Sequence, residues 1–161
     1  MLKPKFKFNR ITDISFEFLL KNNIEALILD VDNTLSTHHG EELVDGLERW
    51  LEYMNEKGIK LIILSNSKKS RVEPFAKKIS LDYIPLGLKP LPFGYIKALR
   101  LLKSKRNNTA IVGDQIFTDV IGGNTVGVKT ILLTPILLET GWSFKLRRRL
   151  EKILYKIYKL D

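Results

Sequence analysis

Short apolar runs alternate along the chain with longer segments of helical periodicity, and this alternation restricts the fold more than any other feature. The apolar runs cover residues 26–29, 60–64, 83–85, 109–112 and 130–133. The first helical segment repeats its apolar residues on one face and stops at Gly58; these residues are Leu43, Leu47, Trp50, Leu51 and Met54. Further helices are predicted near 69–79, 93–103 and 117–125. The alternation predicts an α/β fold of three layers, with a doubly wound, Rossmann-like parallel sheet between helices.

Charged and polar side chains follow the predicted strands at the point where each strand ends. Parallel strands finish at one edge of a sheet, and ligands of such sheets bind beyond that edge. We therefore expect these side chains to converge on one rim. The residues concerned are Asp30, Asp32, Ser65, Asn66, Lys89 and Asp114.

Three acids on this rim would repel one another unless a cation lay between them. The hard oxygen donors of Asp30, Asp32 and Asp114 suit Mg²⁺, and the absence of cysteine excludes thiolate sites. His38 and His39 are interpreted as loop residues, because the chain has no third histidine. Each rim residue also has a structural interpretation, as a turn, a helix N-cap or a solvated lysine. Their joint occurrence at strand ends favours a site for a phosphoryl group instead.

Four short motifs on this rim resemble those of the haloacid dehalogenase-like phosphatases. The sequence DVDNT at 30–34 is similar to the first motif, DxDxT after a hydrophobic strand. Ser65 in IILSN is similar to the second motif, and Lys89 in GLKP to the third. GDQIFTD at 113–119 is similar to the fourth, an acid pair with four residues between its members. All four occur in the expected order.

The resemblance implies a role for each residue of the rim. Asp30 would be the nucleophile that forms an aspartyl-phosphate, and Asp32 the general acid and then the general base. Ser65 and Lys89 would hold the phosphoryl oxygens. The cofactor implied is Mg²⁺, and its implied ligands and their supporting residues are Asp30, the Asp32 carbonyl and Asp114, with Asn66 and Asp119 beside them.

The chain has no room for the cap domain that many members of this family insert. About ten residues, 36–45, separate the first motif from the next helix, and residues 66–88 hold space for one helix and one short strand. The architecture resembles subfamily IIIA, in the branch of YqeG-type and phosphatidylglycerophosphate phosphatases. That resemblance implies hydrolysis of phosphatidylglycerophosphate to phosphatidylglycerol. An open site also requires a large substrate or a partner to exclude water.

The net charge of +9 lies at the two ends of the chain. Residues 1–10 carry +4, residues 142–161 carry +5, and residues 11–141 are neutral. We expect one hydrolase domain over 1–161, with a basic segment at 1–25, a catalytic core at 26–135 and a basic amphipathic tail at 136–161. As a helix, the tail would align an apolar stripe beside basic side chains, as helices on anionic membranes do. The stripe comprises Leu146, Leu150, Ile153, Leu154 and Ile157.

These ends predict an anionic partner, with an anionic phospholipid at a membrane surface preferred. We expect a cytoplasmic enzyme that could bind peripherally at the inner face of the membrane, since no apolar run is long enough to span a bilayer. Nucleic-acid phosphate ends would suit the same charges, although no aromatic stacking platform is evident near the rim. A sugar-phosphate phosphatase closed by its oligomer and a non-catalytic assembly protein on this fold also remain open. The tail could also simply pack on the domain.

Overall fold

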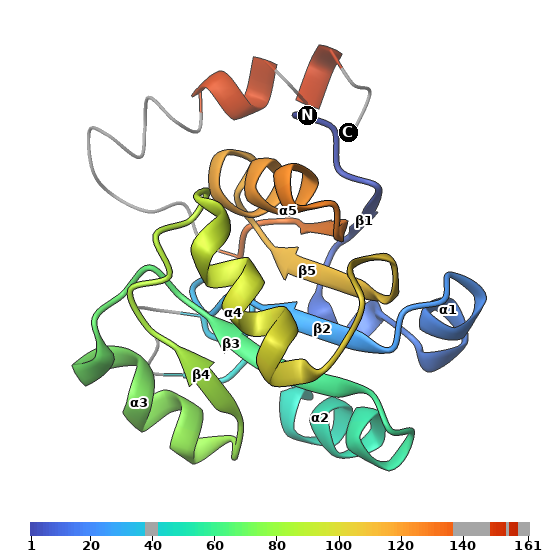
Figure 1. The fold of residues 1–161 in the computed structure, drawn as a ribbon, viewed down its shortest axis with the longest axis vertical. Coiled ribbons are helices and arrows are strands. Elements are labelled where there is room, and N and C mark those ends of the chain that lie inside the picture. The colour runs from blue at the N-terminus through green and yellow to red at the C-terminus, as the bar shows by residue number, and fades with distance from the viewer. Residues whose placement is uncertain (38–41, 137–148, 154, 158–161) are drawn as a thin grey trace.

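The computed structural model describes residues 1–37, 42–136, 149–153 and 155–157 of the chain. Its centre is one sheet of six parallel strands in the order β1-β6-β5-β2-β3-β4 (Figure 1). The strands are β1 (Phe6–Phe8), β2 (Ala26–Leu29), β3 (Lys60–Leu64), β4 (Asp82–Ile84), β5 (Thr109–Gly113) and β6 (Lys129–Leu133). The parallel sheet predicted from the sequence is confirmed, and its chain order reverses between β2 and β5.

Helices cover both faces of this sheet. They are α1 (Phe16–Lys21), α2 (Leu47–Glu56), α3 (Lys69–Lys78), α4 (Pro92–Leu102) and α5 (Ile121–Val126). Two short 3-10 helices, Ile11–Asp13 and Arg106–Asn108, and a π-helical turn, Ile116–Val120, complete the core. In Figure 1, α4 and α5 lie in front of the sheet and α2 lies behind it. The three-layer α/β class is therefore confirmed.

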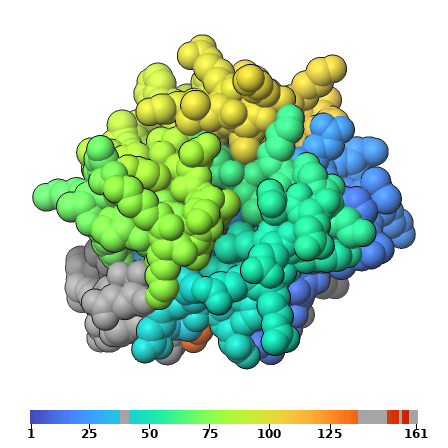
Figure 2. Space-filling view, turned by 90° about the horizontal axis from the view of Figure 1, so that it is seen from below, coloured from blue at the N-terminus to red at the C-terminus, as the bar shows by residue number. Residues whose placement is uncertain are grey.

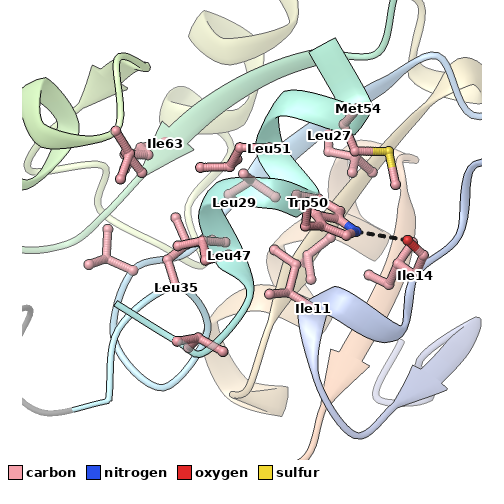
Figure 3. Close-up of a cluster of buried hydrophobic side chains, with 14 of the residues drawn as sticks. Ile11, Ile14, Leu27, Leu29, Leu35, Leu47, Trp50, Leu51, Met54 and Ile63 are labelled. Atoms are coloured by element: carbon pink, nitrogen blue, oxygen red, sulfur yellow. Dashed lines mark hydrogen bonds between the residues drawn. The ribbon is translucent and has the colours of Figure 1, made fainter. Parts of the chain in front are cut away.

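The alternation of side chains along the buried strands divides the core into two parts. In β2, Leu27 and Leu29 pack with α2, whereas Ala26 and Ile28 pack with α4 on the other face. All four are fully buried, as expected for a strand with helices on both sides. On the α2 side, Trp50 packs among the aliphatic side chains (Figure 3) and its indole Nε1 donates to the carbonyl oxygen of Ile14 at 2.8 Å.

The first strand, β1, was not predicted from the sequence. It pairs in parallel with β6 at the edge of the sheet. Phe6 and Phe8 both pack edge-on against Phe18 of α1, with ring centroids 4.9 Å and 4.8 Å apart. The alternation of lysine and phenylalanine in this segment is therefore the period-two pattern of an edge strand, and its phenylalanines contribute to the core.

The described part of the C-terminal tail is helical and contacts the domain through Glu151 and Tyr155. Glu151 is buried, and its carboxylate accepts a hydrogen bond of 3.0 Å from the backbone N–H of Ile116. Tyr155 packs against the apolar cluster that contains Ile116. Leu150, Ile153 and Ile157 of the predicted stripe are exposed, while Leu146 and Leu154 lie outside the described residues. None of the helices within the described ranges is long and apolar enough to cross a membrane.

The amino and carboxyl ends of the strands carry different surface features. Figure 2 shows the side where α2 and α3 lie next to each other. A cleft on this side is lined by residues 58–61 and 78–82, at the amino ends of β3 and β4. The polar residues singled out in the sequence lie at the opposite, carboxyl ends of the strands.

Candidate active site

The register of the sheet brings the ends of β2, β3 and β5 level with one another. Leu29 pairs with Ile63 on one side and with Val112 on the other. The next residue, Asp30, donates its backbone N–H to the carbonyl oxygen of Val112 at 3.0 Å. Its side chain therefore emerges between two neighbouring strands from a backbone position that the sheet fixes.

Lys89 lies buried between two of the rim carboxylates. Its Nζ is 2.7 Å from Oδ1 of Asp30 and 2.6 Å from Oδ1 of Asp119. The side chains of Lys89 and Asp119 are each 2% exposed, so water does not screen the pair. Buried charges are stable only when paired in this way. We call Lys89, Asp30, Asp114 and Asp119 the buried charge cluster.

Three carboxylates of the buried charge cluster lie close enough to share a cation. Oxygens of Asp30, Asp114 and Asp119 all lie within 4.8 Å of one another, and all three residues are buried. With Lys89 as the only base of the cluster, the four side chains carry a net charge of −2 when all are ionised. A divalent cation would neutralise this charge, and three oxygen donors suit a hard ion. These residues therefore fit the metal that the sequence predicts.

The pKa values of the cluster follow from burial and from these pairs. Burial acts to lower the pKa of Lys89, but Asp119 and Asp30 outweigh it and raise that pKa above its ordinary value. Burial raises the pKa of Asp119 to about 6; Lys89 opposes the rise and Asp30 adds to it. Lys89 therefore remains protonated at neutral pH and can present a fixed positive charge to an anion.

Asn66 fixes the backbone of Lys89. Its side-chain Oδ1 accepts from the Lys89 N–H at 2.7 Å, and its Nδ2 donates to the Lys89 carbonyl oxygen at 3.0 Å. Ser65 is buried beside it, and its Oγ accepts a hydrogen bond from the backbone N–H of Ser67 at 3.1 Å. The hydroxyl proton of Ser65 does not take part in that bond, so it can be donated to another acceptor. Asn66 thus positions Lys89, whereas Ser65 offers a hydroxyl proton at the rim.

Gly113 gives the Asp119 carboxylate the room that it occupies. A Cβ at position 113 would overlap the carboxyl group of Asp119. Asp119 belongs to the π-helical turn, where its backbone N–H donates to the carbonyl oxygen of Gln115, and its Oδ2 accepts from the N–H of the same residue at 3.2 Å. Such turns re-aim side chains and are frequent at functional sites. The side chain of Asp119 therefore requires a glycine at position 113.

The side chain of Asp32 is not one of the three clustered carboxylates and pairs with Arg71 of α3. The two side chains are 2.6 Å apart, and 42% of Arg71 and 24% of Asp32 are exposed. Arg71 was not identified from the sequence, because the pair joins residues 39 positions apart. The only local signal is a base in the first turn of the helix that follows Ser65. His38 and His39 lie outside the described residues.

The rim has no cap between β3 and α4. Residues 66–91, all of which the structure describes, contain only α3 and β4 as regular elements. A polar site at the switch point of a parallel sheet, built on DxDxT and holding a buried lysine among carboxylates, defines a class of phosphoryl-handling hydrolases. The haloacid dehalogenase-like hydrolase family model matches residues 37–127. The chain belongs to this family.

Two curated proteins illustrate the relationship. The chain is 34% identical over 142 residues to the probable phosphatase YqeG of Bacillus subtilis. This alignment covers 88% of this chain and 83% of the relative. The chain is 27% identical over 135 residues to the pyrophosphatase PpaX of Halalkalibacterium halodurans, covering 76% of this chain but only 61% of that relative. PpaX is thus similar over part of its own length. With the family model and the YqeG relationship together, the chain is a phosphatase.

A solved structure supports the fold. The 4-nitrophenylphosphatase of Thermotoga maritima superposes with a TM-score of 0.61 and 14% sequence identity, covering 79% of this chain and 91% of that protein. At this identity the likeness concerns the arrangement of the sheet and its helices.

Proposed function

We propose that this phosphatase hydrolyses phosphomonoesters through an aspartyl-phosphate on Asp30. The observation that carries the proposal is the buried charge cluster, in which Lys89 holds Asp30 at 2.7 Å with Asp114 and Asp119 alongside. A buried carboxylate held by a fixed ammonium has the position and the charge that attack on phosphorus requires. A purely structural network would not need three carboxylates for one lysine.

The reaction proceeds in two displacements. An oxygen of Asp30 attacks phosphorus; the Asp30–phosphorus bond forms as the ester oxygen leaves with its electron pair and takes a proton from Asp32. Asp32 then accepts a proton from water, whose oxygen attacks phosphorus. The bond between the Asp30 oxygen and phosphorus breaks, its electron pair returns to the carboxylate, and inorganic phosphate is released. Ser65 and Lys89 hold the phosphoryl oxygens while charge shifts in both transition states.

The proposed cofactor is Mg²⁺, held by the carboxylates of Asp30 and Asp114 and by the backbone carbonyl of Asp32. Asp119, whose carboxylate lies within 4.8 Å of the other two, would help to orient these ligands. When bound, the ion would neutralise charge on the phosphoryl group and on the nucleophile. The preference for Mg²⁺ rests on oxygen-only donors in a chain without cysteine.

The proposed substrate is phosphatidylglycerophosphate, with phosphatidylglycerol as the product. A rim without a cap between β3 and α4 suits a head group presented at a surface. The exposed apolar residues of the tail, Leu150, Ile153 and Ile157, support action there, because exposed basic residues accompany them in the same described segments, 149–153 and 155–157. The relatives named above support a phosphatase without specifying this lipid.

The test is a phosphate-release assay with the purified full-length chain. Its arms are phosphatidylglycerophosphate in vesicles, a 5′-phosphorylated oligonucleotide, common sugar phosphates and pyrophosphate, each with Mg²⁺ or with EDTA. We expect release from the lipid arm, its loss with EDTA and its loss in Asp30→Asn. Release that survives Asp30→Asn would refute the nucleophile, and preference for another arm would refute the lipid substrate.

A further inference from the structure

The segment that carries Lys89 to the rim presents several large apolar side chains to solvent. We call residues 85–93 the leucine loop. Its apolar members are exposed by 50–67% of their surface, although Lys89 between them is buried. They are Leu86 (57%), Leu88 (57%), Leu91 (50%) and Phe93 (67%). Scattered single leucines on a surface are ordinary, whereas four large apolar residues within eight positions form a patch that calls for an explanation.

Hydrogen bonds tie the leucine loop firmly to the end of β3, so the exposure is built into the fold. The N–H of Leu86 donates to the carbonyl oxygen of Ser67 at 3.0 Å, and the N–H of Gly87 to that of Ser65 at 2.8 Å. A Cβ at Gly87 would collide with Leu64, so the loop lies directly on the strand. Asn66 holds Lys89 in addition. The leucines therefore point outward from a fixed backbone.

Leu86 and Leu88 occupy backbone conformations that leucine rarely adopts. Their φ angles are +48° and +54°, in the left-handed region that glycine and asparagine favour. Each leucine there costs about 1 kcal/mol relative to those residues. A polar residue such as asparagine would lower both the strain and the exposed apolar area. The choice of leucine therefore indicates that the side chains contact something apolar.

The charge around the loop identifies the kind of surface that it fits. The segment from residue 83 to residue 99 contains two bases, the buried Lys89 and the exposed Lys97, and no acid. Lys97 lies one turn after Phe93 on α4, and Lys68 and Lys69 begin α3 next to Ser67, which receives the bond from Leu86. All three lysines lie at the surface. Aliphatic side chains rimmed by cations match an anionic lipid bilayer, which offers negative head groups over an apolar interior.

We propose that the leucine loop, with Lys68, Lys69 and Lys97, is a docking surface for an anionic lipid bilayer. The four apolar side chains enter the interfacial region, the three lysines contact lipid phosphates, and the mouth of the site is held against the membrane. The proposal deepens the proposed function and rests on it, since it names the surface by which the enzyme meets a lipid substrate. It differs from the tail in lying on the catalytic rim itself.

Vesicle co-sedimentation of the full-length protein tests the docking surface without using catalysis. The vesicles contain phosphatidylglycerol and phosphatidylcholine, or phosphatidylcholine alone, and no phosphomonoester. Leu86→Asn/Leu88→Asn removes apolar area while keeping the backbone conformation favourable. Leu20→Asn is the matched control, because Leu20 is 65% exposed on α1, on the opposite side of Figure 1. Thermal unfolding checks that each variant folds.

We expect the wild-type protein to bind the anionic vesicles and Leu86→Asn/Leu88→Asn to bind about tenfold or more weakly, with Leu20→Asn unchanged. Lys97→Glu, a second variant in the interior of α4, should also bind more weakly to anionic vesicles. Equal binding of the loop variants and the wild type would overturn the proposal. So would no wild-type binding, an equal loss in Leu20→Asn, or wild-type self-association that the loop variants abolish, since the last outcome would make the loop an interface between copies. Docking and catalysis fail separately, because binding to these vesicles requires no phosphatase activity.

Discussion

Two ion pairs on one rim differ in their access to water. Lys89 holds Asp30 and Asp119 where each partner is less than a tenth exposed, whereas 42% of the Arg71 side chain that holds Asp32 is exposed. Buried pairs cannot lose one partner without leaving an uncompensated charge, but exposed pairs exchange readily with water and contribute little stability. The rim thus combines a fixed nucleophile with an acid whose partner can leave.

This difference matches the proposed roles. The Asp30 carboxylate must stay in one position during both displacements, and its ion pair with Lys89 holds it there. Asp32 must take and give a proton, and a carboxylate locked to arginine cannot do so. Because Arg71 is partly exposed, it can release Asp32 when a substrate arrives. Four substitutions test the comparison, from the largest expected effect to the smallest.

Lys89→Met should have the largest effect, because it leaves two buried carboxylates without their base. We expect a loss of about 3–5 kcal/mol in the free energy of unfolding and at least about a thousandfold drop in hydrolysis. Urea unfolding and release of 4-nitrophenol from its phosphate ester measure the two effects. Lys21→Met, at an exposed lysine on α1, is the control and should change stability by less than about 0.5 kcal/mol. A stable Lys89→Met protein would contradict the buried network.

Gly113→Ala should destabilise the protein by about 1–3 kcal/mol, since the new methyl group would overlap the Asp119 carboxylate. The same overlap displaces Asp119 from Lys89, so activity should fall as well. A double-mutant cycle with Asp119→Ala isolates the cause, because removing the carboxylate makes room for the methyl group. If the two losses simply add, the overlap is not the origin of the effect.

Asp32→Asn should reduce activity strongly while leaving stability within about 1 kcal/mol of wild type. Loss of general acid catalysis is expected to cost about 10²–10⁴ in rate on an alkyl phosphate. The loss should be smaller on 4-nitrophenyl phosphate, whose leaving group needs little protonation. Equal losses on both esters would argue against Asp32 as the acid.

Arg71→Gln should have the smallest effect. An exposed pair contributes less than about 1 kcal/mol, and salt screens it. We therefore expect unfolding curves that differ from wild type only at low ionic strength. A large loss of stability, comparable with that of Lys89→Met, would show that the two pairs do not differ as described.

Local patterns in the sequence predicted much of this structure. The strands and helices around the rim follow from periodicities within ten residues, and β2 and β3 match their predicted bounds. β1 and α1 were missed because each is short and gains its stability from packing between distant segments, as in the contact of Phe6 with Phe18. β4 begins and ends one residue before its predicted bounds, at Asp82 and Ile84.

In the candidate site too, local patterns were predicted and contacts between distant residues were not. The rim residues were predicted from strand ends and motif order, and the structure brings Asp30, Lys89, Asp114 and Asp119 together; their catalytic roles stay predictions. Arg71 and the buried Glu151 were missed, because each partner is far away in the sequence. The exposure of the leucine loop was also unpredictable, since apolar residues beside a strand are usually buried.

The position of Lys89 between Asp30 and Asp119 has a consequence for how activity is acquired. Its two partners lie 59 positions before it and 30 positions after it, so no fragment that stops short of β5 and the π-helical turn can assemble the cluster. Turnover should therefore appear only after β2, β5 and the π-helical turn have come together with the Lys89 segment, late in folding. Catalysis in this chain is a sensitive reporter of the assembled centre of the sheet.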